Sequence, residues 1–121
     1  MKQILLIEDD PFLIDIYTTK LKEEGYAVDV AEDGEEGLRM LRQKKPDLLL
    51  LDVVLPSFNG WEILRKIKRT DDLKDLKVVI LSNLGEKEEV EKGLNLGAAK
   101  YLVKAHYTPT EVIKEIKKIL K

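Results

Sequence analysis

Polar side chains stand at the ends of four short apolar runs, and their types could together carry phosphoryl chemistry. They are Glu8 and Asp9 after residues 3–7, Asp52 after residues 48–51, Ser82 after residues 78–81 and Lys104 after residues 101–103. Carboxylates that lie close together repel, so the pKa of at least one would rise unless a cation lay between them. Oxygen ligands without cysteine or histidine suit a hard ion such as Mg2+. Beside such an ion, a lysine and a hydroxyl could hold a phosphoryl group while one carboxylate serves as nucleophile.

The elements that would position these side chains alternate between strands and helices. Besides the four runs above, residues 27–31 form a weaker run that contains a charge, as an edge strand would. Helix signals lie between the runs, and the strongest is Thr108-Pro109-Thr110-Glu111, which combines a cap, a first-position proline and a capping-box glutamate. Strands that are apolar on both faces and alternate with helices predict a doubly wound α/β fold, a parallel sheet with helices on both faces. Ligands of such sheets bind at the carboxyl ends of the strands, where all the polar residues named above would meet.

One expected helix, over residues 86–96, is weaker than the others. It is highly charged, contains Gly93 near its middle and is expected to end at Gly97. A glycine inside a helix costs about 1 kcal/mol relative to alanine. We therefore expect this helix to be the least stable of the set.

The composition excludes several classes of function. The chain of 121 residues has no cysteine, which removes thiolate zinc sites, thiol nucleophiles and redox pairs. Its single histidine, His106, removes multi-histidine metal sites and is expected to be a loop residue. With 21 basic against 23 acidic residues there is no basic excess for nucleic acid, and no apolar run approaches the ~18 residues of a membrane span. We expect a cytoplasmic protein that binds neither membranes nor, directly, nucleic acid.

Four motifs occur in order along the sequence. They are Ile7-Glu8-Asp9-Asp10, then Leu50-Leu51-Asp52 with Leu55-Pro56-Ser57-Phe58-Asn59-Gly60, then Leu81-Ser82, and last Tyr101-Leu102-Val103-Lys104. With this ordered set the sequence resembles, over its whole length, the receiver domain of two-component response regulators. The resemblance implies a five-stranded flavodoxin-like (βα)5 fold with strand order 2-1-3-4-5, as in CheY-like proteins. From the length of the chain we expect one receiver domain over residues 1–121 with no output domain.

The resemblance implies a role for each acidic residue of the site. Asp52 would be the phosphoacceptor and would also ligate Mg2+. Asp9 would bind the ion directly, Glu8 would act largely through water, and the backbone carbonyl of Val54 would supply a further ligand. The cofactor implied is therefore Mg2+.

The resemblance also implies how the signal is passed on. Lys104 would pair with the phosphate, Ser82 would move to form a hydrogen bond with it, and Tyr101 would turn inward behind Ser82. This would alter the surface formed by the fourth helix, fifth strand and fifth helix, where an unknown protein partner would bind. The phosphodonor would be a histidine kinase or phosphotransfer protein, and the chain would be a monomer or a phosphorylation-dependent dimer. Such a domain is a signalling module that catalyses its own phosphoryl transfer and slow autodephosphorylation, rather than a metabolic enzyme.

Two residues depart from the family pattern. Asn83 follows Ser82 where the family usually has a small residue, so it could contact the phosphate or narrow access to it. Ala105 follows Lys104 where the family commonly has proline after a cis peptide bond. A cis bond before alanine costs about 3 kcal/mol, against well under 1 for proline. We expect a trans bond, with His106 as the extra residue of a longer loop; the alternative is a retained, strained cis bond.

Other functions are possible for this pattern. The chain could be an unphosphorylated or engineered receiver-like scaffold that keeps the fold and the acidic pocket without signalling. A dehalogenase-like phosphatase would need a second acid at the position of Val54. Flavin binding would need a hydroxyl- and glycine-rich phosphate loop where this sequence has Glu8-Asp9-Asp10. These residues argue against both enzyme classes.

Overall fold

Strands and helices alternate along the chain in the computed structural model, which describes residues 1–55 and 59–121. The elements are β1 (Gln3–Ile7), α1 (Pro11–Glu23), β2 (Ala27–Ala31), α2 (Gly34–Gln43), β3 (Leu48–Leu51), α3 (Gly60–Arg69), β4 (Lys77–Ser82), α4 (Lys87–Asn95), β5 (Lys100–Val103), a 3-10 turn (Lys104–His106) and α5 (Pro109–Ile119). Pro56, Ser57 and Phe58 of the second sequence motif lie outside the described residues. None of the helices in the described part has the length and apolarity needed to cross a bilayer.

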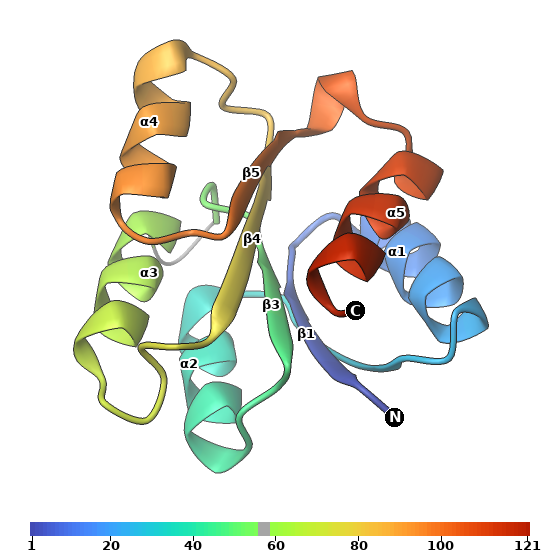
Figure 1. Ribbon diagram of the computed structural model, residues 1–121, viewed down its shortest axis with the longest axis horizontal. Helices are drawn as coiled ribbons and strands as arrows, with labels where there is room; N and C mark the ends of the chain where they lie inside the picture. Colours follow the sequence, from blue (N-terminus) through green and yellow to red (C-terminus); the bar gives the residue numbers. More distant parts are fainter. Residues whose placement is uncertain (56–58) are drawn as a thin grey trace.

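The five strands form one parallel sheet in the order β2-β1-β3-β4-β5 (Figure 1). This confirms the predicted doubly wound fold and its strand order. In the register of the sheet, Ile7 is paired with Leu51 and Leu51 with Ile80, while Ser82 is paired with Val103. Because the strands are parallel, the residues that follow these positions reach the same edge of the sheet.

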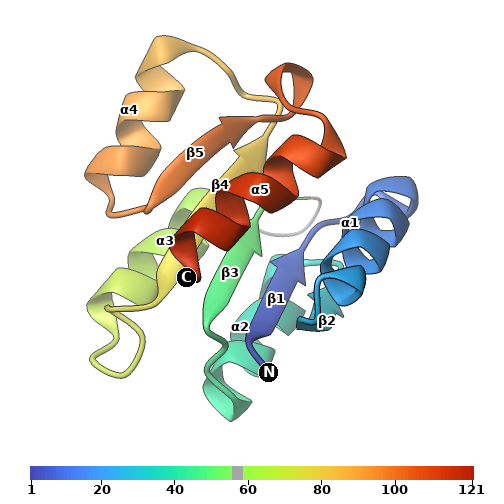
Figure 2. The same ribbon diagram turned by 45° about the vertical axis from the view of Figure 1, so that its right-hand side comes forward.

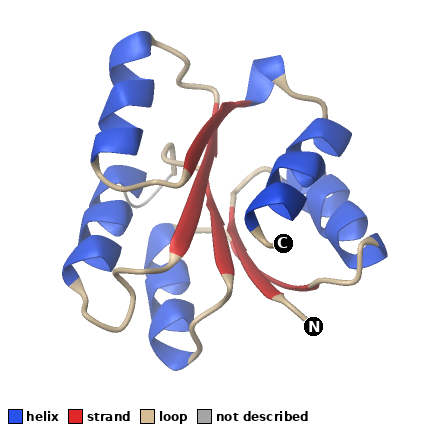
Figure 3. Cartoon of the chain, viewed as in Figure 1, coloured by secondary structure: helices blue, strands red, loops and turns tan. Residues whose placement is uncertain are grey.

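Helices cover both faces of the sheet. Figures 1 and 2 show α1 and α5 on one face and α2, α3 and α4 on the other, and Figure 3 shows the strands enclosed between them. The central strand β3 is fully buried, and its residues alternate between the two cores. Leu50 packs with Leu21 and Ile116 on the α1–α5 side, and Leu49 packs with Ile63 on the other side. Burial of each such side chain contributes about 1.5–3 kcal/mol, so both faces hold the sheet in register.

Side chains cap the helices where the sequence predicts it. Asp10 precedes α1 and accepts a hydrogen bond from the Phe12 backbone N–H at 2.9 Å. At the start of α5, Thr108 accepts from the Glu111 N–H at 3.2 Å, and the Glu111 carboxylate accepts from the Thr108 N–H at 2.9 Å. This reciprocal pair is the predicted capping box.

The helix α4 has fewer stabilising features. Its cap residue Glu86 makes no side-chain capping hydrogen bond among the described residues, and within α4 Gly93 is the buried residue. We expected the helix to end at Gly97; the cap is instead Leu96, and Gly97 follows it with a φ of +104°. A positive φ strains any residue with a Cβ, which explains why glycine occupies this position.

The turn after β5 follows the expected path. The Lys104–Ala105 peptide bond is trans. Lys104 begins a 3-10 turn that ends at His106, and the turn leads to the cap of α5. This confirms the predicted trans bond.

Candidate functional site

Two buried carboxylates lie side by side at the carboxyl edge of the sheet. Glu8 follows Ile7 and Asp52 follows Leu51, the paired last residues of β1 and β3. The Asp52 backbone N–H donates to the carbonyl of Ile7 at 3.1 Å, which continues the strand pairing one residue further. Glu8 is 1% exposed and Asp52 is 6% exposed. Buried carboxylates need partners, because burial without them costs several kcal/mol.

Lys104 is the shared partner of both carboxylates. Its Nζ lies 2.7 Å from Glu8 Oε1 and 2.9 Å from Asp52 Oδ2. Burial alone would lower the pKa of Lys104, but the hydrogen bonds and negative charges of Glu8 and Asp52 raise it above its ordinary value. Burial raises the pKa of Glu8, an effect that its hydrogen bond to Lys104 opposes. Two carboxylates against one ammonium leave one negative charge, which draws a further cation to this edge.

The remaining carboxylate oxygens accept backbone hydrogen bonds. Glu8 Oε2 accepts from the N–H groups of Asp9 and Asp10, at 3.1 and 3.2 Å. Asp52 Oδ1 accepts from the N–H of Val54 at 2.9 Å. Both side chains are therefore held in one orientation. The sequence did not predict the ion pair between Glu8 and Lys104.

The acidic cluster has the chemistry and spacing of a divalent-cation site. Glu8, Asp9 and Asp52 each place one carboxylate oxygen within 4.8 Å of the other two. Mg2+ binds oxygen at about 2.0–2.1 Å in an octahedron, so neighbouring ligands lie about 3–4 Å apart. Asp9 is exposed, and its carboxylate has no hydrogen-bond or ion-pair partner in residues 1–55 and 59–121. Asp9 is thus free to bind an ion, and the donor set fits a hard cation.

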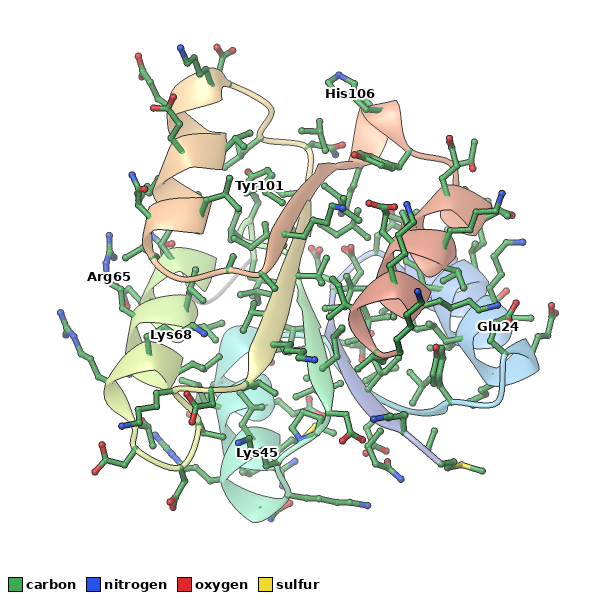
Figure 4. All side chains as sticks on the ribbon, viewed as in Figure 1. Glu24, Lys45, Arg65, Lys68, Tyr101 and His106 are labelled. Atoms are coloured by element: carbon green, nitrogen blue, oxygen red, sulfur yellow. The ribbon has the colours of Figure 1, made fainter. Side chains whose placement is uncertain are left out.

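Ser82 and Tyr101 form a second group, joined through the backbone of Leu84. Ser82 is fully buried, and its Oγ accepts from the Leu84 N–H at 3.2 Å. The Tyr101 hydroxyl donates to the Leu84 carbonyl at 2.5 Å. Tyr101 is 8% exposed and already lies inward, between α4 and the sheet, as Figure 4 shows, whereas the resemblance implied that it would turn inward on phosphorylation. Burial raises the pKa of Tyr101, so its hydroxyl stays protonated and can donate at neutral pH.

An aromatic pair that the sequence did not reveal lies beside this group. The rings of Trp61 and Tyr101 are stacked with centroids 6.4 Å apart and an interplanar angle of 25°. Lys92 of α4 places its Nζ 4.6 Å from the Trp61 ring centroid. The residues come from α3, β5 and α4. Only the three-dimensional arrangement of these elements brings them together.

The remaining residues singled out in the sequence lie at the rim or outside the site. Val54 is 54% exposed and forms an isolated antiparallel bridge with Asn59. Asn83 is exposed directly after the buried Ser82. His106 lies on the outer turn, exposed to solvent (Figure 4). The site is therefore built from the acidic cluster and Lys104, with Ser82 and Tyr101 behind them.

Comparison with known sequences gives one family for nearly the whole chain. The profile of the response regulator receiver domain matches residues 4–117. A curated relative, the transcriptional regulatory protein AfsQ1 of Streptomyces coelicolor, is 40% identical over 104 residues, which are 86% of this chain and 45% of AfsQ1. The chain spans about half the length of the curated relatives it matches.

Solved structures of similar length have the same fold. A response regulator from Chloroflexus aurantiacus superposes with a TM-score of 0.90 at 29% identity, covering 98% of this chain and 97% of that one. The phosphorylated cyanobacterial phytochrome response regulator RcpA gives a TM-score of 0.85 at 30% identity, with 98% and 90% of the two chains covered. The likeness therefore extends over the whole sheet and its helices.

Proposed function

The chain belongs to the response regulator receiver domain family, and from this membership we propose that it is a phosphorylation switch with Asp52 as the phosphoacceptor. Receiver domains of this family signal rather than carry out metabolic catalysis. The chain is homologous to phosphorylatable response regulators. The observation that carries the proposal is Asp52 itself, a buried carboxylate that lies beside Lys104 and two further acidic residues.

The transfer step uses the geometry around Asp52. An Asp52 carboxylate oxygen would attack the phosphorus of a phosphohistidine, forming a P–O bond as the P–N bond breaks and the electron pair leaves with the imidazole nitrogen. The Val54 N–H and Lys104 Nζ hold the two Asp52 oxygens before attack. Such positioning and charge compensation supply most of the catalysis in phosphoryl transfer.

Mg2+ would complete the charge compensation. Asp9, Asp52 and the backbone carbonyl of Val54 would bind it, with Glu8 acting largely through water. When bound, the ion would neutralise charge on the phosphoryl oxygens. The Lys104 ammonium group would then pair with the phosphoryl group as well as with the carboxylates.

Ser82 would sense the phosphoryl group. Its side chain would move so that the hydroxyl donates to a phosphoryl oxygen, and this movement would weaken the hydrogen bond that Ser82 Oγ accepts from the Leu84 N–H. Because Tyr101 donates to the carbonyl of the same residue, a shift at Leu84 would reach Tyr101. From there it would alter the surface formed by α4, β5 and α5.

The partners follow from this mechanism. We propose a histidine kinase or phosphotransfer protein as the phosphodonor and a protein that binds the α4–β5–α5 surface as the receiver of the signal. Residues 1–121 would act as one receiver domain, a monomer or a phosphorylation-dependent dimer, in the cytoplasm. Slow autodephosphorylation, with Asn83 beside the site, would end the signal.

Phosphorylation by a small phosphodonor tests the proposal. Incubation with acetyl phosphate and MgCl2 is expected to add one phosphoryl group, measured by intact-protein mass spectrometry. Asp52→Asn should abolish the gain, and Asp9→Asn should raise the MgCl2 concentration needed for it. Asp29→Asn is the matched control, since Asp29 is an exposed acid on β2 away from the site.

Two outcomes would contradict the proposal. A mass gain that persists in Asp52→Asn would place the modification elsewhere. If no gain occurs at any pH or MgCl2 concentration, the chain is better described as an unphosphorylated receiver-like scaffold.

A further inference from the structure

The position of the Tyr101 ring is fixed from two sides. At one end its hydroxyl donates to the Leu84 carbonyl at 2.5 Å. Along its face it stacks on Trp61, with centroids 6.4 Å apart. The hydrogen bond belongs to the proposed switching path from Ser82, but the stacking contact does not.

Trp61 is itself tied to the loop that follows Asp52. Trp61 is 5% exposed and lies in the first turn of α3, where its backbone N–H donates to Asn59 Oδ1 at 2.9 Å. The preceding Gly60 N–H donates to the Val53 carbonyl at 3.1 Å. A Cβ on Gly60 would lie 2.3 Å from the Val53 Cα. Only glycine allows α3 to begin this close to the backbone next to Asp52, so the main chain at Trp61 is tied to that backbone.

The helix α4 packs on the same aromatic pair. Lys92 Nζ lies 4.6 Å from the Trp61 ring centroid, a cation–π distance. A Cβ on Gly93 would lie 2.7 Å from Cδ2 of Tyr101 and 2.7 Å from Cδ1 of Ile80. The position of α4 therefore depends on where the rings of Trp61 and Tyr101 lie.

We propose that Trp61 is a positioning residue that holds Tyr101 inward, so that the start of α3 controls the switch aromatic alongside Ser82. This inference rests on the proposed function, because it concerns the regulation of the same site. Two routes then lead from the phosphoacceptor to α4. One runs from Ser82 through Leu84 to Tyr101, and the other runs from the Asp52–Val53 backbone through α3 and Trp61 to Tyr101. Loss of the second route would leave the Tyr101 ring without its stacking partner.

The position of Tyr101 can be measured by 19F NMR of protein labelled with 3-fluorotyrosine. The chain has four tyrosines, and the spectrum of Tyr101→Phe identifies the Tyr101 resonance. In Trp61→Leu loss of the Trp61 ring current alone shifts this resonance, so the readout is its line width, which is expected to increase in the unphosphorylated protein as the ring leaves its fixed position. Acetyl phosphate with MgCl2 should narrow the line again. Trp61→Phe, which keeps a stacking ring, should lie close to the wild type.

A control separates positioning from general loss of packing. Leu41→Ala truncates another buried residue of the same core, on α2, and should lower stability without broadening the Tyr101 resonance. A second readout is the initial rate of phosphorylation by acetyl phosphate. We take phosphorylation to require the inward position of Tyr101. When only about a tenth of the Trp61→Leu molecules have Tyr101 inward, the rate is therefore expected to fall about tenfold.

Three results would overturn the inference. The Tyr101 resonance could keep its wild-type line width in Trp61→Leu, it could broaden as much in Leu41→Ala, or Trp61→Phe could behave like Trp61→Leu. Failure of the proposed function would look different. The protein would then gain no phosphoryl mass, while the spectra of the unphosphorylated variants would still show whether Trp61 holds Tyr101.

Discussion

The helices α4 and α5 flank the same edge strand, β5, but they are held in different ways. α5 begins with a complete capping box and buries Val112, Ile113 and Ile116 against the sheet. α4 has no side-chain cap among the described residues, and its buried residue is Gly93. Its ion pair, Lys87–Glu91, is long and exposed at 3.9 Å, and such pairs contribute little.

The difference indicates which of the two helices, α4 or α5, can move when the site changes. Local stability follows buried apolar contacts and capped ends, and elements that move are drawn from the less stable part of a fold. α5 is part of the framework that keeps the sheet in register. α4 rests on the rings of Tyr101 and Trp61, so a change in the rings can move it at small cost. The following predictions test this contrast between a framework helix and a responsive one.

The largest difference is expected from truncating one core contact in each helix. Ile116→Ala should lower the free energy of unfolding by about 2–5 kcal/mol, because Ile116 is fully buried and leaves a cavity. Val90→Ala, at a half-buried position of α4, should cost about 1 kcal/mol. Urea denaturation followed by circular dichroism gives both values. Equal losses would remove the distinction between the two helices.

A methyl group on Gly93 tests whether α4 is limited by packing. Alanine favours a helix by about 1 kcal/mol over glycine, but overpacking costs about 1–3 kcal/mol, and a Cβ here would lie 2.7 Å from Tyr101 and from Ile80. We expect Gly93→Ala to be destabilising by about 1 kcal/mol and to speed amide hydrogen exchange in α4. Asn95→Ala, at an exposed position of the same helix, is the control. A more stable Gly93→Ala would show that propensity alone limits α4.

Changes at the two helix caps should give effects of up to the same size but of opposite sign. Thr108→Ala removes the α5 cap and should cost about 1 kcal/mol. Glu86→Asp offers α4 a capping side chain that it lacks among the described contacts, and should gain up to about 1 kcal/mol. Hydrogen exchange of the first-turn amides in each helix measures both effects. An unchanged α4 in Glu86→Asp would mean that its start is not limited by capping.

The smallest effect concerns pH. The hydrogen bond from the Thr108 backbone, together with that from its side chain, lowers the pKa of Glu111 below its ordinary value of 4.5. A carboxyl whose pKa is lowered by folding stabilises the folded state above its unfolded pKa and loses this contribution as pH falls through its folded pKa. Protection of the first turn of α5 should therefore decrease below about pH 4.5. Glu111→Gln should reduce this pH dependence, and an unaltered profile would contradict it.

Most of the framework could be predicted from local patterns. The run Leu48–Leu51 is apolar at every position, which is typical of a buried central strand, and Thr108 with Glu111 marks the start of α5 unambiguously. The placement of Glu8, Asp52 and Lys104 together follows from the rule that parallel strands end at one edge. These features depend on short stretches of sequence and on one general property of the fold.

The contacts between distant side chains could not be predicted in the same way. The resemblance implied that Lys104 pairs with the phosphate, whereas the structure also shows an ion pair between Lys104 and Glu8. The sequence marked Gly93 as a weakness of α4, but the reason for the glycine is the space that the Tyr101 ring occupies. The stack of Tyr101 on Trp61 depends on side-chain directions that neither composition nor periodicity contains.

The pairing of Ile7 with Leu51 has a consequence for quality control in the cell. Shifting a strand by one residue turns its side chains to the opposite face, so a mispaired sheet would separate Glu8 from Asp52 and Lys104 from both. A misfolded copy would then lack the means to accept a phosphoryl group. Under the proposed function, only correctly folded molecules can be phosphorylated. Misfolded copies would therefore not signal at all, instead of sending a false signal.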